Sequence, residues 1–130
     1  MIKEDFVSFE TAKLLKEKGF DEYCSGYYKF DKSLGILSNA IINNSALDDD
    51  GIDISAPTLQ MAMKWLREEK NYHIMIDCHG TKNWLPTIQH TVGSDDYKIE
   101  GKVQKISGNG FDSYEEAVVA ALKYCLTILI

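Results

Sequence analysis

The clearest hydrophobic pattern lies near the C-terminal end of the chain, where apolar residues recur at intervals of three and four. Such spacing places them on one face of a helix. Ser113 and Glu116 precede this stripe and form a capping box, in which each side chain binds a backbone N–H of the first turn. We therefore predict an amphipathic helix that begins after Ser113 and packs against a sheet. Its apolar stripe consists of Val118, Ala121, Leu122, Cys125, Leu126 and Leu129.

A period of two precedes this helix and predicts three β-strands. In residues 72–79, Ile74, Ile76 and Cys78 alternate with His73, Met75, Asp77 and His79. This alternation is typical of a strand with one buried face. Residues 84–92 form the second predicted strand, where Pro86 favours an edge position or a strand start because it has no N–H. Residues 97–106 form the third, with Gly101 as a candidate bulge, and the short connections favour an antiparallel meander.

Two further helices are predicted nearer the N-terminus. The first begins after Ser8, which caps it, and ends before Gly19, which tolerates the left-handed conformation of a helix end. The second starts near Pro57, whose fixed φ suits the first helical position, and continues to about Lys70. Trp65 lies off its apolar stripe, so that this helix either is covered on two sides or offers an aromatic ring to a partner. The stripe itself consists of Leu59, Ala62, Met63 and Leu66.

The segment 21–54 between these helices is acidic and rich in loop-forming residues. Seven acids against two lysines give it a net charge of −5. The apolar and aromatic runs at residues 22–30 and 36–42 allow a hairpin through residues 31–35. The asparagines, aspartates and glycine of residues 43–45 and 48–51 favour a loop, which we expect to be mobile.

These patterns predict an α+β fold: a three-stranded antiparallel sheet packed by a C-terminal helix, with two further helices and an N-terminal hairpin or irregular segment. The chain of 130 residues has the length of a single domain. Its three cysteines, Cys24, Cys78 and Cys125, are far apart, which indicates reduced thiols buried as small apolar side chains. No stretch resembles a secretion signal or approaches the roughly 18 apolar residues of a membrane span, so we expect a soluble cytoplasmic protein that does not bind membranes.

Three groups of residues invite a chemical interpretation. The acidic run 48–53 does not fit the helix-loop-helix calcium motif, because aligning Gly51 with the invariant glycine leaves Pro57 in the place of the bidentate glutamate. His73 and His79 share a strand face but lie about 20 Å apart at about 3.3 Å per residue, too far to hold one metal ion. Cys78 and His79 face opposite ways and form no nucleophile and base pair. We therefore expect no enzyme, no metal and no cofactor.

The charge of the chain also bears on nucleic-acid binding. A formal net charge of −6 and a pI near 5.0 disfavour a nucleic-acid-binding protein. The predicted strands contain no arginine, which is the usual reader of guanine edges. The alternative that remains is a sheet-based binder whose lysines contact phosphates. These lysines are Lys82, Lys98, Lys102 and Lys105.

Residues 4–22, 55–74 and 111–126 together resemble a group of small proteins encoded in Bacteroides-type genomes, often in phage-like or mobile elements. This resemblance covers roughly half of the chain and implies no particular activity. A second similarity concerns architecture alone. Three strands followed by a capped helix are similar to the DNA-binding domain of plant ethylene-response factors and the arm-binding domain of phage integrases, in which the sheet enters the major groove.

We predict from these observations a non-catalytic accessory or protein-interaction protein of a phage-like or mobile element. The predicted partner is another protein, and an open strand edge near Pro86 also allows a homodimer. The candidate interaction surface combines the outer face of the sheet with the flank of the second helix. Its residues are Trp65, His73, Asp77 and His79.

Overall fold

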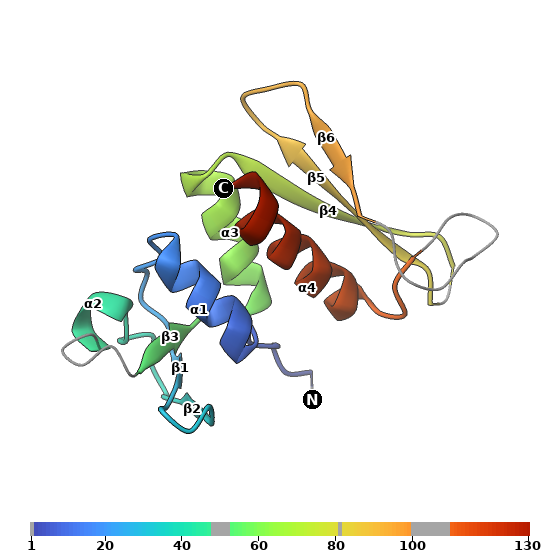
Figure 1. Ribbon diagram of the computed structural model, residues 1–130. Coiled ribbons are helices and arrows are strands. Elements are labelled where there is room, and N and C mark those ends of the chain that lie inside the picture. The colour runs from blue at the N-terminus through green and yellow to red at the C-terminus, as the bar shows by residue number, and fades with distance from the viewer. Residues whose placement is uncertain (1, 48–52, 81, 100–109) are drawn as a thin grey trace. The chain divides into compact units, whose positions relative to one another are not determined.

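The computed structural model describes residues 2–47, 53–80, 82–99 and 110–130 (Figure 1). These residues form an α+β structure with two three-stranded antiparallel sheets and helices that include a C-terminal one. The predicted fold class is therefore confirmed. The chain divides into two compact units, Met1–Ala62 and Met63–Ile130. Helix α3, Leu59–Glu69, runs through the boundary between them.

The first unit contains a small sheet with strand order β2-β1-β3. Helix α1 packs against β3 of this sheet. Ser8 caps α1 as predicted, since its Oγ accepts a hydrogen bond of 3.2 Å from the backbone N of Thr11. Gly19 follows the helix with a φ of +97°, which an L side chain rarely adopts. The elements of this unit are α1 (Phe9–Glu17), β1 (Gly26–Tyr28), β2 (Leu34–Ile36), α2 (Asn44–Leu47) and β3 (Ile54–Ala56).

The predicted hairpin is present as β1 and β2, but its second strand lies at Leu34–Ile36 and not at residues 36–42. The turn covers residues 29–33, two residues earlier than predicted, and Asp31 Oδ1 stabilises it by accepting a hydrogen bond of 3.0 Å from the backbone N of Ser33. Gly35 can therefore pair directly with Tyr27, whose ring lies across it. A Cβ at position 35 would stand only 2.6 Å from that ring, which explains the glycine within a strand.

Residues 44 and 45 of the predicted loop 43–45 instead begin the short helix α2, and Asn43 directly precedes it. The backbone N of Ala46 donates to Asn43 Oδ1 at 2.8 Å, so that Asn43 uses its side chain to cap a helix and not to form a turn. Strand β3 is a second element that the sequence pattern did not predict, since three residues are too few for a clear alternation. Residues 48–52 of the predicted mobile loop lie outside the described residues.

Helix α3 ends near the predicted position but begins at Leu59, two residues after Pro57. Thr58 is its cap, because Thr58 Oγ1 accepts a hydrogen bond of 3.2 Å from the backbone N of Met61. Pro57 instead accepts a hydrogen bond of 3.0 Å at its carbonyl from the backbone N of Val7. The prediction placed Pro57 inside the helix because proline suits both that position and an extended residue before it.

The second unit contains the predicted meander, with strand order β4-β5-β6 and antiparallel pairing throughout. Helix α4 lies across β4 and β5, as Figure 1 shows. It ends in a π-helical turn at Cys125–Leu129, and the Ser113 half of the predicted capping box is present, because the backbone N of Glu116 donates to Ser113 Oγ at 3.1 Å. The elements are β4 (Tyr72–Cys78), β5 (Trp84–His90), β6 (Asp96–Lys98) and α4 (Tyr114–Tyr124). Residues 100–109, with the candidate bulge at Gly101, lie outside the described residues.

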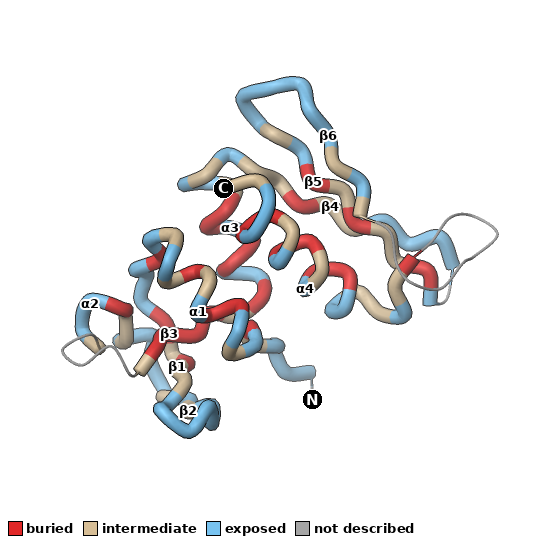
Figure 2. Tube along the Cα trace, viewed as in Figure 1, coloured by how far each residue is buried: buried red, intermediate tan, exposed pale blue. Residues whose placement is uncertain are grey.

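The core of the second unit lies between the sheet and α4. Ile74 and Ile88 pair across β4 and β5, and both are buried. The helical residues that the sequence placed on one face, Val118 and Leu122 among them, are buried as well, except Leu129, which is half-buried. Figure 2 shows buried positions recurring along α4. The edge-to-face contact of Trp84 and Tyr114, with ring centroids 6.0 Å apart, joins one end of the sheet to the helix. The predicted packing of the C-terminal helix on the meander is thus confirmed.

Pro86 lies in the central strand β5 and not at an edge or a strand start. Its carbonyl accepts a hydrogen bond of 3.1 Å from the backbone N of Ile99, on the side of β5 that faces β6. The missing N–H of Pro86 faces the same side, because both groups of one residue point to the same neighbour in an antiparallel ladder. Strand β6 ends at Lys98, next to this position. A central strand tolerates this proline because its neighbour stops there.

Candidate functional site

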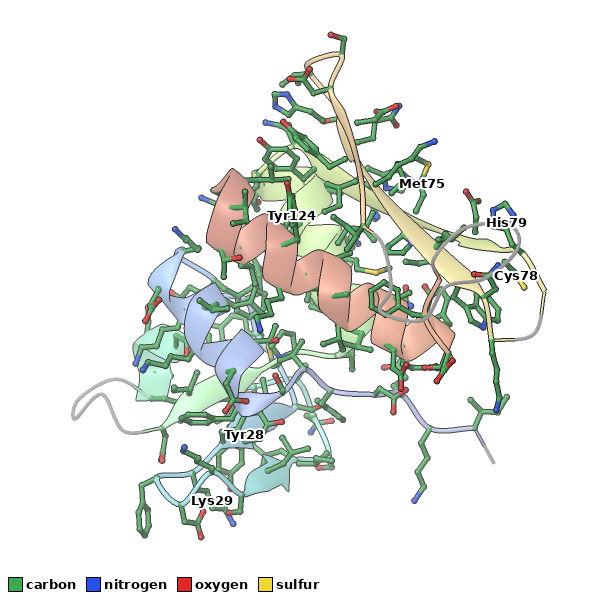
Figure 3. The ribbon with its side chains drawn as sticks, turned by 45° about the vertical axis from the view of Figure 1, so that its right-hand side comes forward. Tyr28, Lys29, Met75, Cys78, His79 and Tyr124 are labelled. Carbon is green, nitrogen blue, oxygen red and sulfur yellow. The ribbon has the colours of Figure 1, made fainter. Side chains whose placement is uncertain are left out.

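One face of the β4-β5-β6 sheet is turned away from α4. His73, Met75 and Asp77 alternate with the buried Ile74, and Figure 3 shows Met75 and His79 on the side of β4 away from Tyr124 of α4. Asp77 and His79 are exposed, whereas His73 and Met75 are half-buried. The structure therefore brings His73, Asp77 and His79 to the predicted face of the strand.

Trp65 differs from these three residues because it is only 5% exposed. The ammonium group of Lys70 lies 5.5 Å from the centre of its ring. Of the two interpretations that the sequence allowed, a helix covered on two sides agrees with this burial. Trp65 therefore has little exposed surface with which to contact a partner protein. The candidate interaction surface is reduced to His73, Asp77 and His79.

The structure offers no support for a metal site on this face. The described part of the chain contains no group of three or more histidine, cysteine, aspartate or glutamate side chains that could hold a metal ion. His73 has a different property of interest. Its Nδ1 is buried and has no hydrogen-bond partner among the described residues.

The lysines of the nucleic-acid alternative are only partly described. Lys98 is exposed on β6 and pairs with Thr87, so that it shares the sheet face of Met75. Lys82 is exposed in the turn after β4 with a φ of 60°. Lys102 and Lys105 lie outside the described residues. Nucleic-acid binding by the sheet therefore stays a prediction.

The three cysteines are free, but they are not alike. Cys24 and Cys125 are buried as predicted, and burial raises the pKa of their thiols to about 11 and about 12. The prediction was wrong for Cys78, which is exposed, with Sγ 3.5 Å from the carbonyl oxygen of Gly80. Cys78 is the last residue of β4 and lies on the same strand face as the buried Ile74, but at this end of the strand that face is exposed.

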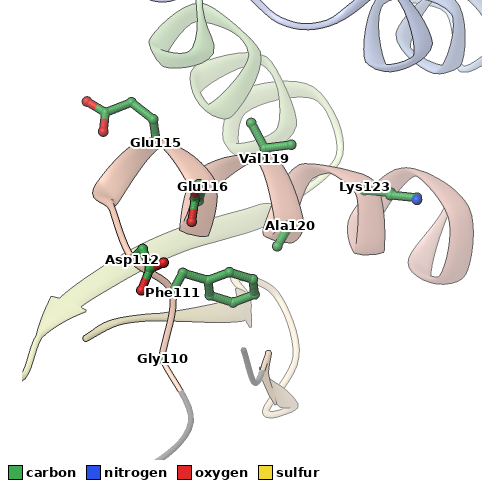
Figure 4. Close-up of a pocket in the computed structure, with 8 residues that line it drawn as sticks. All are labelled: Gly110, Phe111, Asp112, Glu115, Glu116, Val119, Ala120 and Lys123. Carbon is green, nitrogen blue, oxygen red and sulfur yellow. The ribbon is translucent and has the colours of Figure 1, made fainter. Parts of the chain in front are cut away.

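A groove runs along the outer side of α4 and has a volume of about 570 Å³. Its apolar floor consists of Phe111, Val119 and Ala120, and Figure 4 shows the Phe111 ring next to Ala120. Asp112 lies toward one end of this α4 groove and Lys123 toward the other (Figure 4). The complete lining is Gly110, Phe111, Asp112, Glu115, Glu116, Val119, Ala120 and Lys123.

Backbone pairing at the end of β5 holds the floor of the α4 groove in place. The backbone N and O of Phe111 both hydrogen-bond to Trp84, at 2.8 and 2.9 Å. Gly110 precedes this bridge and touches Asn83 so closely that a Cβ would overlap Asn83 Oδ1. Sequence reasoning missed the groove because its floor combines a residue before the helix with the flank of the helix. The recurrence of Glu115, Val119 and Lys123 at intervals of four was the available signal.

No protein-family model, curated protein or solved structure matches the chain in the three comparisons made with known proteins. Within the part of the chain that the structure describes, no helix is long and apolar enough to cross a membrane. The assignment of function therefore depends on the surfaces of the molecule itself.

Proposed function

We propose that this protein is a non-catalytic protein-interaction domain that holds a short segment of a partner protein in the α4 groove. The observation that supports this proposal is a sizeable groove with an apolar floor and charged ends. Its volume of about 570 Å³ lies within the roughly 300–1,000 Å³ usual for binding clefts. The resemblance to proteins of phage-like elements suggests an accessory role in such an element.

The floor of the α4 groove favours an apolar side chain. Val119 is 38% exposed, although most large apolar residues of α4 are buried. Phe111 and Ala120 beside it are half-buried. Covering this surface removes apolar area from water, which is favourable by roughly 25 cal/mol per Å².

The rim of the groove favours a basic residue next to that apolar one. Asp112, Glu115 and Glu116 give three exposed carboxylates, whereas Lys123 is the one ammonium group in the lining. Complementary charge across an interface contributes to specificity and to the rate of association. None of these titratable side chains is buried, so the groove lacks the desolvated acid or base that catalysis usually requires. We therefore expect a partner segment with a large apolar residue beside arginine or lysine.

Two blocked tetrapeptides test this proposal, acetyl-Leu-Phe-Arg-Leu-amide and acetyl-Leu-Phe-Glu-Leu-amide. We expect the arginine peptide to bind about fivefold more tightly, because an exposed ion pair contributes at most about 1 kcal/mol. Titration of ¹⁵N-labelled protein should shift the amide signals of Phe111, Val119 and Ala120. Failure of both peptides to bind at millimolar concentration, or shifts elsewhere alone, would refute the proposed site.

Charge reversal supplies the matched control. The double variant Glu115→Lys/Glu116→Lys should reverse the preference, so that the glutamate peptide binds more tightly. Asp95→Lys/Asp96→Lys changes the net charge by the same amount in and beside the turn before β6, and it should leave the preference as it is. Because both peptides are compared on the same variant, an altered stability affects both measurements alike. Equal effects of the two double variants would mean that net charge alone decides the preference.

A further inference from the structure

Strand β4 forms one edge of its sheet and is seven residues long. The backbone groups of its odd-numbered residues point toward β5, as the flanking hydrogen bonds from His79 N to Asn83 O and from Thr91 N to Asn71 O show. The N–H and C=O groups of the even-numbered residues therefore point outward. Among the described residues, no backbone group pairs with them from the other side. They belong to Tyr72, Ile74, Ile76 and Cys78.

This edge lacks the features that normally keep strand edges from pairing. The opposite edge, β6, is only three residues long and carries Asp96 and Lys98. Strand β4 has no proline, glycine or lysine, and Asp77 is its one acidic residue. Natural proteins protect edges by shortness, lysine, proline or bulges. An edge of this length without these features is therefore open to pairing with another strand.

We propose that this strand is β4 of a second copy of the chain. Antiparallel pairing about a two-fold axis at Met75 aligns the complete strand with itself, with Tyr72 opposite Cys78 of the second copy and Ile74 opposite Ile76. All four residues with outward backbone groups then lie in hydrogen-bonded pairs. The two sheets become one continuous six-stranded sheet.

Side-chain complementarity selects this register. It places His73 opposite Asp77 of the second copy, and the two-fold axis repeats this pair on the other side of Met75. Both pairs occupy non-hydrogen-bonded positions, where facing Cα atoms lie about 4.5 Å apart and side chains meet most closely. A shift of two residues in one direction puts His73 opposite Met75, and a shift in the other direction puts it opposite His79. The register with complete overlap is therefore also the one that pairs an imidazole with a carboxylate.

This proposal is independent of the peptide-binding function of the α4 groove. Met75 lies on the face of the sheet away from α4 (Figure 3), and His73 and Asp77 share this face by the alternation of the strand. The lining of the groove contains no residue of β4. The dimer can therefore fail without affecting peptide binding, and peptide binding can fail without affecting the dimer.

Sedimentation equilibrium of the full chain tests the association. We expect a dimer at micromolar concentration. His73→Asp places two carboxylates opposite each other and should raise the dissociation constant about tenfold, and Asp77→His should weaken the dimer as well. The double variant His73→Asp/Asp77→His exchanges the partners and should restore the wild-type value. Asp95→His, the same substitution in the exposed turn after β5, is the control and should change nothing.

A cysteine variant tests the register even where a charge variant folds poorly. In a Cys78→Ser background, Met75→Cys should form a disulfide-linked dimer under mild oxidation, because the two copies of this residue face each other across the axis. Thr87→Cys, on the neighbouring strand of the same face, should remain monomeric on a non-reducing gel. A wild-type monomer at 200 µM, or equal cross-linking at both positions, would overturn the proposal.

Discussion

Asn44 joins two segments of the first unit that are far apart in the sequence. Its Nδ2 donates to the carbonyl oxygen of Phe20 at 2.7 Å, and its Oδ1 accepts from the backbone N of Ser55 at 2.9 Å. Asn44 is buried, so water cannot replace either bond. One side chain thereby satisfies a backbone acceptor after α1 and a backbone donor on β3.

Replacing Asn44 should therefore destabilise the protein. In the variant Asn44→Ala, the backbone N of Ser55 loses this hydrogen bond, and a buried unpaired polar group costs about 1–3 kcal/mol. We expect the free energy of unfolding in urea to fall by at least about 1–3 kcal/mol. Asn39→Ala, in an exposed segment of the same unit, is the control and should stay within about 0.5 kcal/mol of wild type. A small loss at Asn44 would mean that water reaches these groups after all.

At the scale of elements, the packing of α4 on the meander gives the second unit its main core. Leu122 is fully buried in that face. Leu122→Ala should lower the free energy of unfolding by about 2–5 kcal/mol, the usual cost of such a truncation with the cavity it leaves. Ile128→Ala removes a side chain that is 65% exposed and should cost about 0.5 kcal/mol or less. Chemical denaturation would measure the free energy of unfolding of both variants. Equal losses in the two would contradict a stabilising role of the buried face of α4.

The elements that the sequence predicted well are those set by local chemistry. The caps at Ser8 and Ser113 act within three residues, and the periods of β4 and α4 extend over seven or more residues. Strand β3 and the role of Asn44 were missed because they depend on partners more than ten residues away. The position of Pro86 was wrong for a related reason, since only the end of β6 makes a central proline tolerable.

The candidate site divides in the same way. The common face of His73 and Asp77 followed from the period of the strand alone. The burial of Trp65 depends on which other segments pack against α3, and the sequence pattern of α3 alone does not identify those segments. The α4 groove was missed because Phe111 joins it through pairing with Trp84 across a distance of 27 residues.

At the scale of the whole molecule, the two units each contain one buried thiol, Cys24 in the first and Cys125 in the second. At pH 8 both should resist iodoacetamide, since burial excludes the reagent and a raised pKa keeps the thiol protonated. The exposed Cys78 should react quickly. Mass spectrometry of labelled peptides would identify each site.

The same labelling in increasing urea tests the prediction of a single folding domain. Because α3 belongs to both units, unfolding one unit breaks a helix of the other. We therefore expect Cys24 and Cys125 to become reactive at the same urea concentration. Labelling of Cys24 well before Cys125 would show two domains that unfold separately.

The π-helical turn at Cys125–Leu129 has a consequence for changes in chain length. Such a turn holds one residue more than an α-helical turn, and here the backbone N of Ile130 reaches back to the carbonyl oxygen of Cys125 at 3.1 Å. Loss of Thr127 from the gene would let the segment relax into an ordinary α-helix, whereas loss of one residue within Tyr114–Tyr124 would turn the apolar stripe by about 100° away from the sheet. The π-helical turn is thus a position where the protein can lose one residue with little loss of stability.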